Sequence, residues 1–190
     1  ERFTTIASWR GPYGVVEAGG RTFGLKVHEF RKFLELPQRC GGAFELALDI
    51  HPADGKDLER LRRHGWTVVD PKAVAGDPER FRRYVQGSRA EFSVAQGIYV
   101  DTNSGWFSDR TARYLASGKP ALVQDTGFSR TLPVGEGLLA FRTLEEAVAG
   151  AEAIARDYAR HSRAARAIAE DYFDSDKVLG RLLDEIGVSA

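Results

Sequence analysis

Short apolar segments of strand length alternate with helical patterns along most of this chain, at intervals of about 20 to 30 residues. Such alternation implies a parallel sheet whose strands are joined by right-handed helical crossovers. The sequence therefore predicts an α/β fold: a Rossmann-like parallel sheet of about six strands with helices on both faces. The strand candidates are 3–8, 44–50, 66–69, 91–94, 121–124 and 138–141.

Three helical segments follow the last strand candidate, at 144–155, 160–172 and 176–186. The final segment places its apolar residues on one stripe, as an amphipathic helix does. We expect these three segments to form helices that cover the sheet. Earlier, Val27, Phe30 and Phe33 recur at helical spacing, and we expect Pro37 to end that helix.

The size and charge of the chain limit what it can be. At 190 residues it fits one domain with a sizeable core. Lysine plus arginine and aspartate plus glutamate both number 27. Because the net charge is zero, no overall field attracts nucleic acid or an anionic membrane, and neither is an expected partner.

The number of cysteines, the spacing of the histidines and the hydropathy of the chain exclude further classes of protein. The single cysteine, Cys40, cannot form an internal disulfide, and the four histidines show no spacing typical of metal ligands. The longest run without a charged residue, 92–100, has nine residues, against the roughly 20 that a membrane helix needs. We expect no metal and a cytoplasmic protein. A dinucleotide-binding enzyme is disfavoured, since the first strand is not followed by G-x-G-x-x-G.

The stretch 104–127 combines two features of a ligand-binding edge. A loop of glycine and aromatic residues leads into a helix opened by Ser108 and Asp109, residue types that cap helix N-termini. After Gly118 ends that helix, a short apolar strand leads into a polar turn, 125–127. In parallel α/β sheets, ligands lie outside the carboxyl ends of strands, where helix N-termini attract phosphate.

This stretch resembles the donor-binding half of GT-B glycosyltransferases. Residues 105–108 (GWFS) align with the EGFG of that family, 113–120 (RYLASGKP) with EAMACGKP, and 124–127 (QDTG) with SDVG. The segment 137–147 resembles the next strand and helix of the family. The similarity extends over about 88–155, and the remainder follows the family in the order of its elements.

Two positions differ from the family pattern. The paired glutamates that contact sugar and ribose in the family fall here on Gly105 and Arg113. The spacing of Ser108, Arg110 and Gly118 is similar instead to the branch related to spore-coat glycosyltransferases, in which an arginine stands at the start of this helix. The resemblance therefore implies a divergent member, and it leaves open how ribose is held.

The resemblance implies a nucleoside diphosphate sugar as substrate, held without a metal or other cofactor. Cations or N–H donors would stabilise the diphosphate as it leaves. The candidates for diphosphate binding are Arg10, Lys26, Ser108, Arg110, Asp125, Thr126 and Gly127. The candidates for ribose or sugar are Gly105, Asp109 and Arg113. The candidates for a loop that reads the base are Asp70, Pro71 and Val74.

Each candidate also has a structural explanation. The cations can be solvated surface residues, the turn 125–127 can be an ordinary turn, and Ser108 and Asp109 can be helix caps alone. Trp106 and Phe107 are expected to anchor their loop rather than to stack on a ligand. The sequence Asp174-Ser175-Asp176 is interpreted as a helix cap rather than a metal site.

The chain starts at Glu1 and contains no methionine, which we interpret as a lobe taken from a longer protein. The predicted organisation is one lobe, 1–190, whose N-terminal acceptor lobe is absent. We expect the lobe alone to bind nucleotide weakly and to transfer nothing; the acceptor is unknown and no residue is assigned as a general base. Two alternatives stay open: a non-catalytic binding module with this fold, and a lobe of a sugar-nucleotide epimerase.

Overall fold

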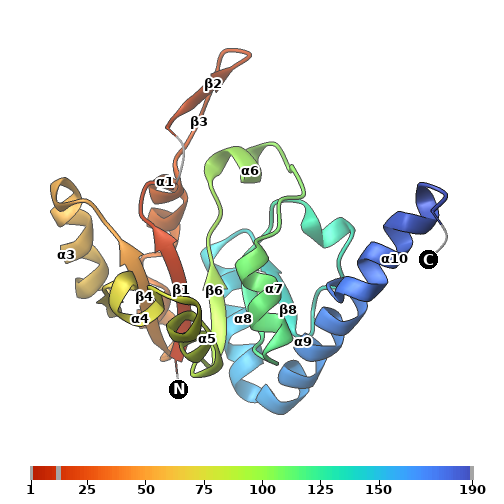
Figure 1. Cartoon of the computed structure of the whole chain (residues 1–190). Helices are drawn as coiled ribbons and strands as arrows, with labels where there is room; N and C mark the ends of the chain where they lie inside the picture. Colours follow the sequence, from red (N-terminus) through yellow and green to blue (C-terminus); the bar gives the residue numbers. More distant parts are fainter. Residues whose placement is uncertain (1, 12–13, 189–190) are drawn as a thin grey trace.

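The computed structural model describes residues 2–11 and 14–188, and its centre is a six-stranded sheet (Figure 1). The strand order is β5-β4-β1-β6-β7-β8, and all neighbouring strands in it are parallel. This confirms the predicted Rossmann-like α/β fold. The strands are β1 (Arg2–Ser8), β4 (Ala43–Asp49), β5 (Trp66–Val69), β6 (Ala90–Ser93), β7 (Ala121–Gln124) and β8 (Leu138–Phe141).

The strand order reverses between β1 and β6. The chain first adds β4 and then β5 on one side of β1. It then returns and adds β6, β7 and β8, in that order, on the other side. β1 is paired with β4 over seven residue pairs, whereas it is paired with β6 over only two, Phe3 with Ala90 and Thr4 with Glu91. Beyond these pairs, β1 and β6 diverge toward their carboxyl ends.

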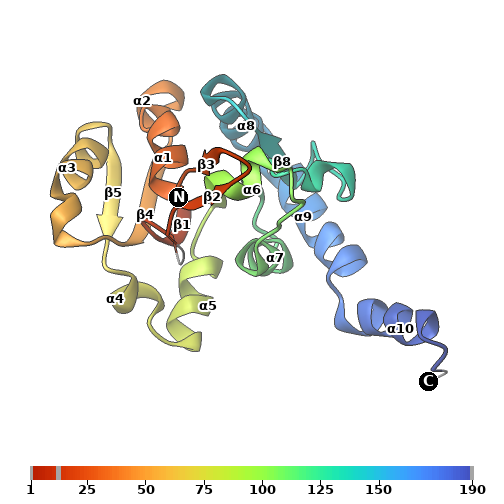
Figure 2. The same cartoon turned by 90° about the horizontal axis from the view of Figure 1, so that it is seen from above.

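Helices cover both faces of the sheet, as predicted (Figure 2). The helices on one side are α1 (Lys26–Phe30), α2 (Leu36–Cys40), α3 (Gly55–Arg63) and α8 (Leu144–Arg156). The helices on the other side are α4 (Pro71–Ala75), α5 (Pro78–Gln86), α7 (Asp109–Ala116) and α9 (Tyr158–Tyr172). A short helix, α6 (Gly97–Asp101), lies beyond the carboxyl end of β6.

The face beneath α1, α2, α3 and α8 is packed with aromatic rings. Phe92, in the central strand β6, stacks on Phe141 with ring centroids 5.2 Å apart and also meets the edges of Phe30 and Phe44. Phe3 stacks on Phe44 at 4.9 Å. These rings belong to one buried hydrophobic cluster, which therefore joins the first helices to the centre of the sheet.

The opposite face is divided. Below α7 and α9, the strands β7 and β8 carry an apolar cluster that includes Leu115, Val123 and Ile168. Below α5 and α7, the central strands carry polar side chains instead. Thr4 donates to Ser88 Oγ at 2.6 Å, and its hydroxyl also lies 2.6 Å from the hydroxyl of Tyr114.

Some local predictions were wrong. The segment between β1 and α1, for which no strand was predicted, contains a hairpin, β2 (Val16–Ala18) and β3 (Arg21–Phe23), which projects beyond the carboxyl edge of the sheet (Figure 1). Pro37 does not end a helix; it lies in the first turn of α2, where the backbone N–H that proline lacks has no partner to bond. A short 3-10 helix, Arg31–Phe33, separates α1 from α2.

The three C-terminal helices are confirmed, but the last does not cover the sheet. α10 (Ser175–Glu185) has no buried residue and extends away from the body of the molecule (Figures 1 and 2). Its apolar residues Val178, Leu182 and Ile186 are exposed. Among the helices of the described residues, none combines the length and apolar character needed to cross a bilayer.

Candidate functional site

Arg110, from the first turn of α7, fills the gap where β1 and β6 diverge. Its Nη1 donates to the carbonyl oxygen of Ile6 in β1 at 2.7 Å, and its Nη2 donates to Ser93 Oγ in β6 at 2.8 Å. Its Nε donates to Glu91 Oε1 at 2.6 Å. Since a guanidinium has five N–H groups, three of them are committed to holding the two strands and α7 together.

Glu91 and Arg110 form a buried ion pair. The side chain of Glu91 is fully buried and that of Arg110 is 14% exposed. Burial alone would lower the pKa of Arg110, but the carboxylate of Glu91 raises it above its ordinary value, so the arginine stays charged. Removing one member of such a pair is strongly destabilising because the other charge is left buried without compensation. Arg110 is therefore a fixed cation at the base of the gap.

Lys26, the first residue of α1, is a cation without a partner. It is half-buried, and none of the described residues forms a hydrogen bond or ion pair with it. Burial and the nearby charge of Arg110 lower the pKa of Lys26 to about 8, with Glu91 acting in the opposite direction. The Lys26 side chain is thus mostly charged at neutral pH, and it lies near the ion pair of Arg110 and Glu91.

Arg10, predicted to share the diphosphate with these cations, is directed elsewhere. Its Nε donates to Asp54 Oδ2 at 2.9 Å and its Nη2 to Asp54 Oδ1 at 2.8 Å. The hydrogen bond and the charge of Asp54 raise the pKa of Arg10. Arg10 is more than half exposed, and its guanidinium is drawn toward the segment after β4 rather than toward Arg110.

The loop before α7 and the turn after β7 are joined by hydrogen bonds. The backbone N–H of Gly105 donates to the carbonyl of Thr126 at 2.8 Å, and the hydroxyl of Thr126 donates to the carbonyl of Trp106 at 2.5 Å. Ser108 is the N-cap residue of α7 and is buried, but its side chain makes no capping hydrogen bond. The expected capping role of the Ser108 hydroxyl was therefore wrong.

Asp125 uses its carboxylate to hold the turn after β7. Its Oδ1 accepts the backbone N–H of Gly127 and its Oδ2 accepts the hydroxyl of Ser129, each at 2.8 Å. Arg142 also donates to Oδ2 at 2.8 Å. Burial raises the pKa of Asp125, but these donors outweigh that effect and lower it. The interactions favour the structural explanation of this turn, in which Gly127 adopts a left-handed conformation with φ of 96°.

The two sugar candidates on α7 bind each other. Arg113 Nη2 lies 3.0 Å from Asp109 Oδ2, and both side chains are exposed. The guanidinium of Arg113 also lies over the ring of Phe81 in α5, 5.4 Å from its centroid. Arg113 is thus directed along the helix toward α5, apart from Gly105 and the turn after β7.

The aromatic residues of the loop before α7 have partners within the protein. Phe107 packs against Phe128 and Phe173, as expected for an anchor. Trp106 stacks on Tyr99 of α6 with centroids 4.9 Å apart and planes 9° apart. Both rings of this second pair stay partly exposed.

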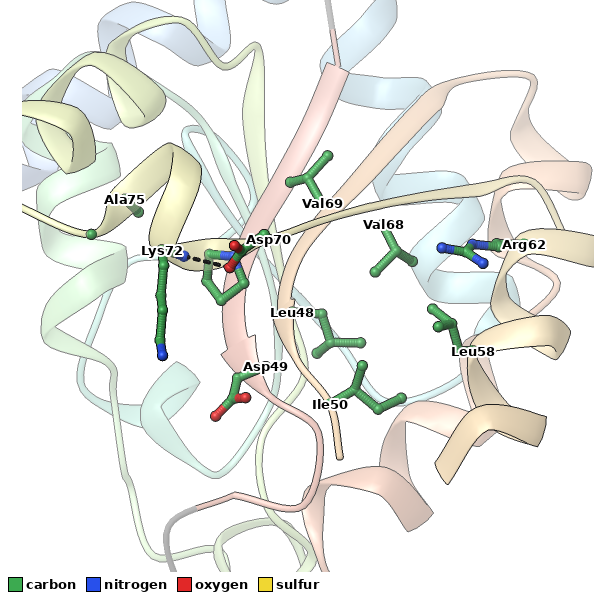
Figure 3. Close-up of a pocket in the computed structure, with 12 residues that line it drawn as sticks. Leu48, Asp49, Ile50, Leu58, Arg62, Val68, Val69, Asp70, Lys72 and Ala75 are labelled. Carbon is green, nitrogen blue, oxygen red and sulfur yellow. Dashed lines mark hydrogen bonds between the residues drawn. The ribbon is translucent and has the colours of Figure 1, made fainter. Parts of the chain in front are cut away.

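The predicted base loop borders a cavity of about 630 Å³ at the carboxyl ends of β4 and β5 (Figure 3). Asp70 and Pro71 line it, but Asp70 also caps α4 by accepting the N–H of Lys72 at 2.9 Å. Val74 lies outside it, in a neighbouring hollow with Arg83 and Tyr84. The walls combine apolar side chains with charged groups: Leu48, Ile50, Leu58, Asp49, Arg62 and Lys72.

The structure also bears on the acidic motif near the C-terminus. Asp174 Oδ1 accepts the N–H groups of Asp176 and Lys177, each at 3.1 Å, which is the expected cap of α10. Within residues 2–11 and 14–188, no group of three or more histidine, cysteine, aspartate or glutamate side chains could hold a metal ion.

Sequence reasoning missed Glu91, the partner of Arg110. The other residues of this short central strand are Ala, Phe and Ser, and burying a glutamate among them is costly unless a cation pairs with it. The presence of Glu91 in a predicted strand could therefore have indicated a buried ion pair. The identity of the cation depends on which helix covers β6, which the sequence alone does not specify.

Comparison with known proteins gives a fold but no family. No protein-family model matches the chain, and no curated protein matches its sequence. Among solved structures it resembles AviGT4, a glycosyltransferase involved in avilamycin A biosynthesis, with 16% identity, a TM-score of 0.52, and coverage of 97% of this chain and 52% of that one. It is also similar to a UDP-forming α,α-trehalose-phosphate synthase from Burkholderia vietnamiensis, with 12% identity, a TM-score of 0.48, and coverage of 98% and 46%.

The backbone fold of the chain is thus similar to that of about half of AviGT4. It spans about half the length of the solved structures it matches. At this level of identity the likeness concerns the arrangement of the backbone, and the chemistry must be argued from the side chains.

Proposed function

We propose that this chain is the donor-binding, C-terminal lobe of a GT-B glycosyltransferase and that it binds a nucleoside diphosphate sugar at the carboxyl edge of its sheet. The backbone likeness to AviGT4 and the sequence resemblance over 88–155 support this function. So does the reversal of strand order between β1 and β6, because ligands of open α/β sheets bind where that order reverses.

The observation that carries the proposal is Lys26. An ammonium group that is half-buried and has no anionic partner is unfavourable in the free protein, and a phosphate group would supply the missing charge. The fixed charge of Arg110 beside it adds to the positive potential. Lys26 is therefore the primary diphosphate residue, and Arg110, held by Glu91, is a fixed positive charge near it.

The spacing of the cavity and of the seam between β1 and β6 fits the proposed ligand. The cavity at the ends of β4 and β5 and the gap between β1 and β6 are separated by two strand spacings, or about 10 Å. That separation is comparable to the length of a nucleoside diphosphate. The base would lie in the cavity beside Asp70 and Pro71, and the diphosphate would lie near Lys26. Arg10 follows β1, between them, and could join the diphosphate by exchanging its pair with Asp54.

The proposed chemistry is glycosyl transfer to an acceptor held by a second lobe. Charge grows on the diphosphate as the glycosidic bond breaks, and a cation placed in advance stabilises that charge. The positions of the two family glutamates are Gly105 and Arg113, so the contacts to the sugar must come from other groups. The two alternatives differ in outcome: a binding module releases the sugar nucleotide unchanged, and an epimerase lobe returns its epimer.

Calorimetry with UDP, GDP and dTDP sugars tests this function. We expect one of the three to bind at millimolar concentration or below, and Lys26→Met to weaken that binding about tenfold or more, as expected for the loss of a charge-assisted bond. Lys177→Met, a change in the exposed helix α10, is the matched control and should leave affinity unchanged.

The pH dependence of the same binding gives a second readout. Because the pKa of Lys26 is about 8, affinity should fall between pH 7 and pH 9 as the ammonium loses its proton, and Lys26→Met should lose this dependence. Absence of binding by all three nucleotide sugars, also when the chain is joined to its second lobe, would contradict the proposed function.

A further inference from the structure

Gln96 carries a buried donor without an acceptor. It lies three residues after the end of β6 and is the N-cap residue of α6, and it is 4% exposed. Its Nε2 atom is buried and has no hydrogen-bond partner among the residues that the structure describes. Buried polar groups are almost always hydrogen-bonded, so an unpaired one calls for an explanation.

A second glutamine shows what a purely structural role looks like in this protein. Gln124, at the end of β7, is also buried, and both ends of its amide are paired. Its Oε1 accepts the N–H of Ala95 at 3.1 Å and its Nε2 donates to Glu29 Oε2 at 2.7 Å. The same residue type, one strand away, is thus fully satisfied, whereas Gln96 is not.

The unpaired amide lies where the loops after β1 and β6 meet. Gly11, in the loop after β1, has φ of +87°, and a Cβ atom built there would lie only 1.9 Å from Gln96 Nε2. The amide therefore rests directly on the Cα of Gly11. A Cβ at Gly97 would lie 2.8 Å from the carbonyl oxygen of Gly24, two residues before Lys26. The residue after Gln96 therefore touches the segment that carries Lys26.

We propose that Gln96 is a ligand-binding residue whose side-chain N–H donates to an oxygen of the diphosphate bound beside Lys26. This inference rests on the proposed function. It adds the uncharged amide of Gln96 to the cations of the proposed diphosphate site. In the free protein the amide packs against Gly11. Glycine at position 11 permits the close approach, because any larger residue would occupy the place of the amide.

Stability and affinity should move in opposite directions when Gln96 is changed. Methionine has nearly the shape of glutamine but no amide, so Gln96→Met removes the unpaired donor from the interior. We expect the variant to melt at a higher temperature than the wild type and to bind diphosphate at least tenfold more weakly. A structural role would give a lower melting temperature and unchanged affinity.

The experiment measures thermal unfolding and the binding of two probes, UDP and inorganic pyrophosphate. Gln124→Met is the matched control: it leaves two buried groups without partners, so the melting temperature should fall while affinity, measured well below that temperature, stays constant. Gln96→Glu is a second variant, in which a carboxylate replaces the donor. It should weaken the binding of both probes further through repulsion.

The outcomes separate this inference from the function it rests on. If the wild type binds neither probe, the proposed function and the role of Gln96 fail together. If the wild type binds a probe and both Gln96 variants bind it equally well, the role of Gln96 is wrong while the proposed function stands. Weaker binding by both variants, with unchanged binding by Gln124→Met, supports the assignment.

Discussion

The two faces of the central strands differ in how they are held together. Alternate residues of the same strands point to opposite faces. Phe3, Phe44 and Phe92 turn toward α1, α2 and α3 and join a cluster of stacked rings. Their immediate neighbours Thr4 and Glu91 turn toward α5 and α7 and join hydrogen bonds and an ion pair.

The difference shows how the fold separates stability from ligand binding. The aromatic face gains from the removal of apolar surface from water, and it needs no particular partner for any one ring. The polar face gains little net free energy from its pairs, but it fixes the position of each group. That fixed geometry lies directly below the gap between β1 and β6, where the ligand is proposed to bind.

The largest effect should come from the aromatic face. Phe92→Ala removes the ring that contacts Phe30, Phe33, Phe44, Trp66 and Phe141. We expect the free energy of unfolding to fall by about 4 kcal/mol, because a buried phenylalanine leaves a large cavity. Urea unfolding measures the change. Phe81→Ala, which truncates a half-exposed ring, is the control, and an equal loss in both would show that the cluster is not the centre of stability.

A somewhat smaller effect is expected on the polar face. Glu91→Leu leaves Arg110 buried without its carboxylate and should cost about 3 kcal/mol. The double variant Glu91→Leu with Arg110→Met removes both charges and should be more stable than Glu91→Leu alone. A double-mutant cycle by urea unfolding measures the coupling. If the two changes were simply additive, the pair would not be the organising interaction of this face.

The smallest effect concerns His161 of α9. Its Nδ1 accepts the backbone N–H of Gly137 at 3.2 Å, which requires the unprotonated ring nitrogen, and burial lowers its pKa. The unfolded chain then binds a proton more readily, so stability is complete above pH 6.5 and declines as the pH falls below it.

For this single group the slope is at most about 1.4 kcal/mol per pH unit. Unfolding measured between pH 7.5 and 5.5 should show the decline in the wild type and a flatter dependence in His161→Gln. His51→Gln, at an exposed position, should retain the wild-type slope. A slope unaffected by His161→Gln would mean that other groups set the pH dependence on this face.

The fold could be predicted from the sequence because each strand and helix is indicated by residues close together in the chain. All six strands of the sheet were predicted to within one residue at either end, since most of them are short runs rich in apolar or β-branched residues. The hairpin was missed because β2 and β3 have only three residues each and their Gly19-Gly20 turn resembles any flexible loop. Two adjacent glycines indicate that the chain reverses direction, but they do not show that strands precede and follow the turn.

The candidate site was predicted less well than the fold because its contacts join residues that are distant in sequence. Arg10 and Asp54 are 44 residues apart, and Arg110 and Ile6 are 104 residues apart. The sequence marked Arg110, but which of its N–H groups stay available depends on the register of β1 against β6. The predicted roles of Ser108, Asp125 and the remaining candidates in ligand binding stay predictions.

The single guanidinium between β1 and β6 has a mechanical consequence. Backbone pairing joins these strands over two residue pairs only, so the two halves of the sheet share a short seam. The side chain of Arg110 acts there as a spacer, and it sets the distance between β1 and β6 at their carboxyl ends. The spacing of β1 and β6 at their carboxyl ends is therefore a property of α7 as well as of the strands, because the arginine that links them belongs to that helix.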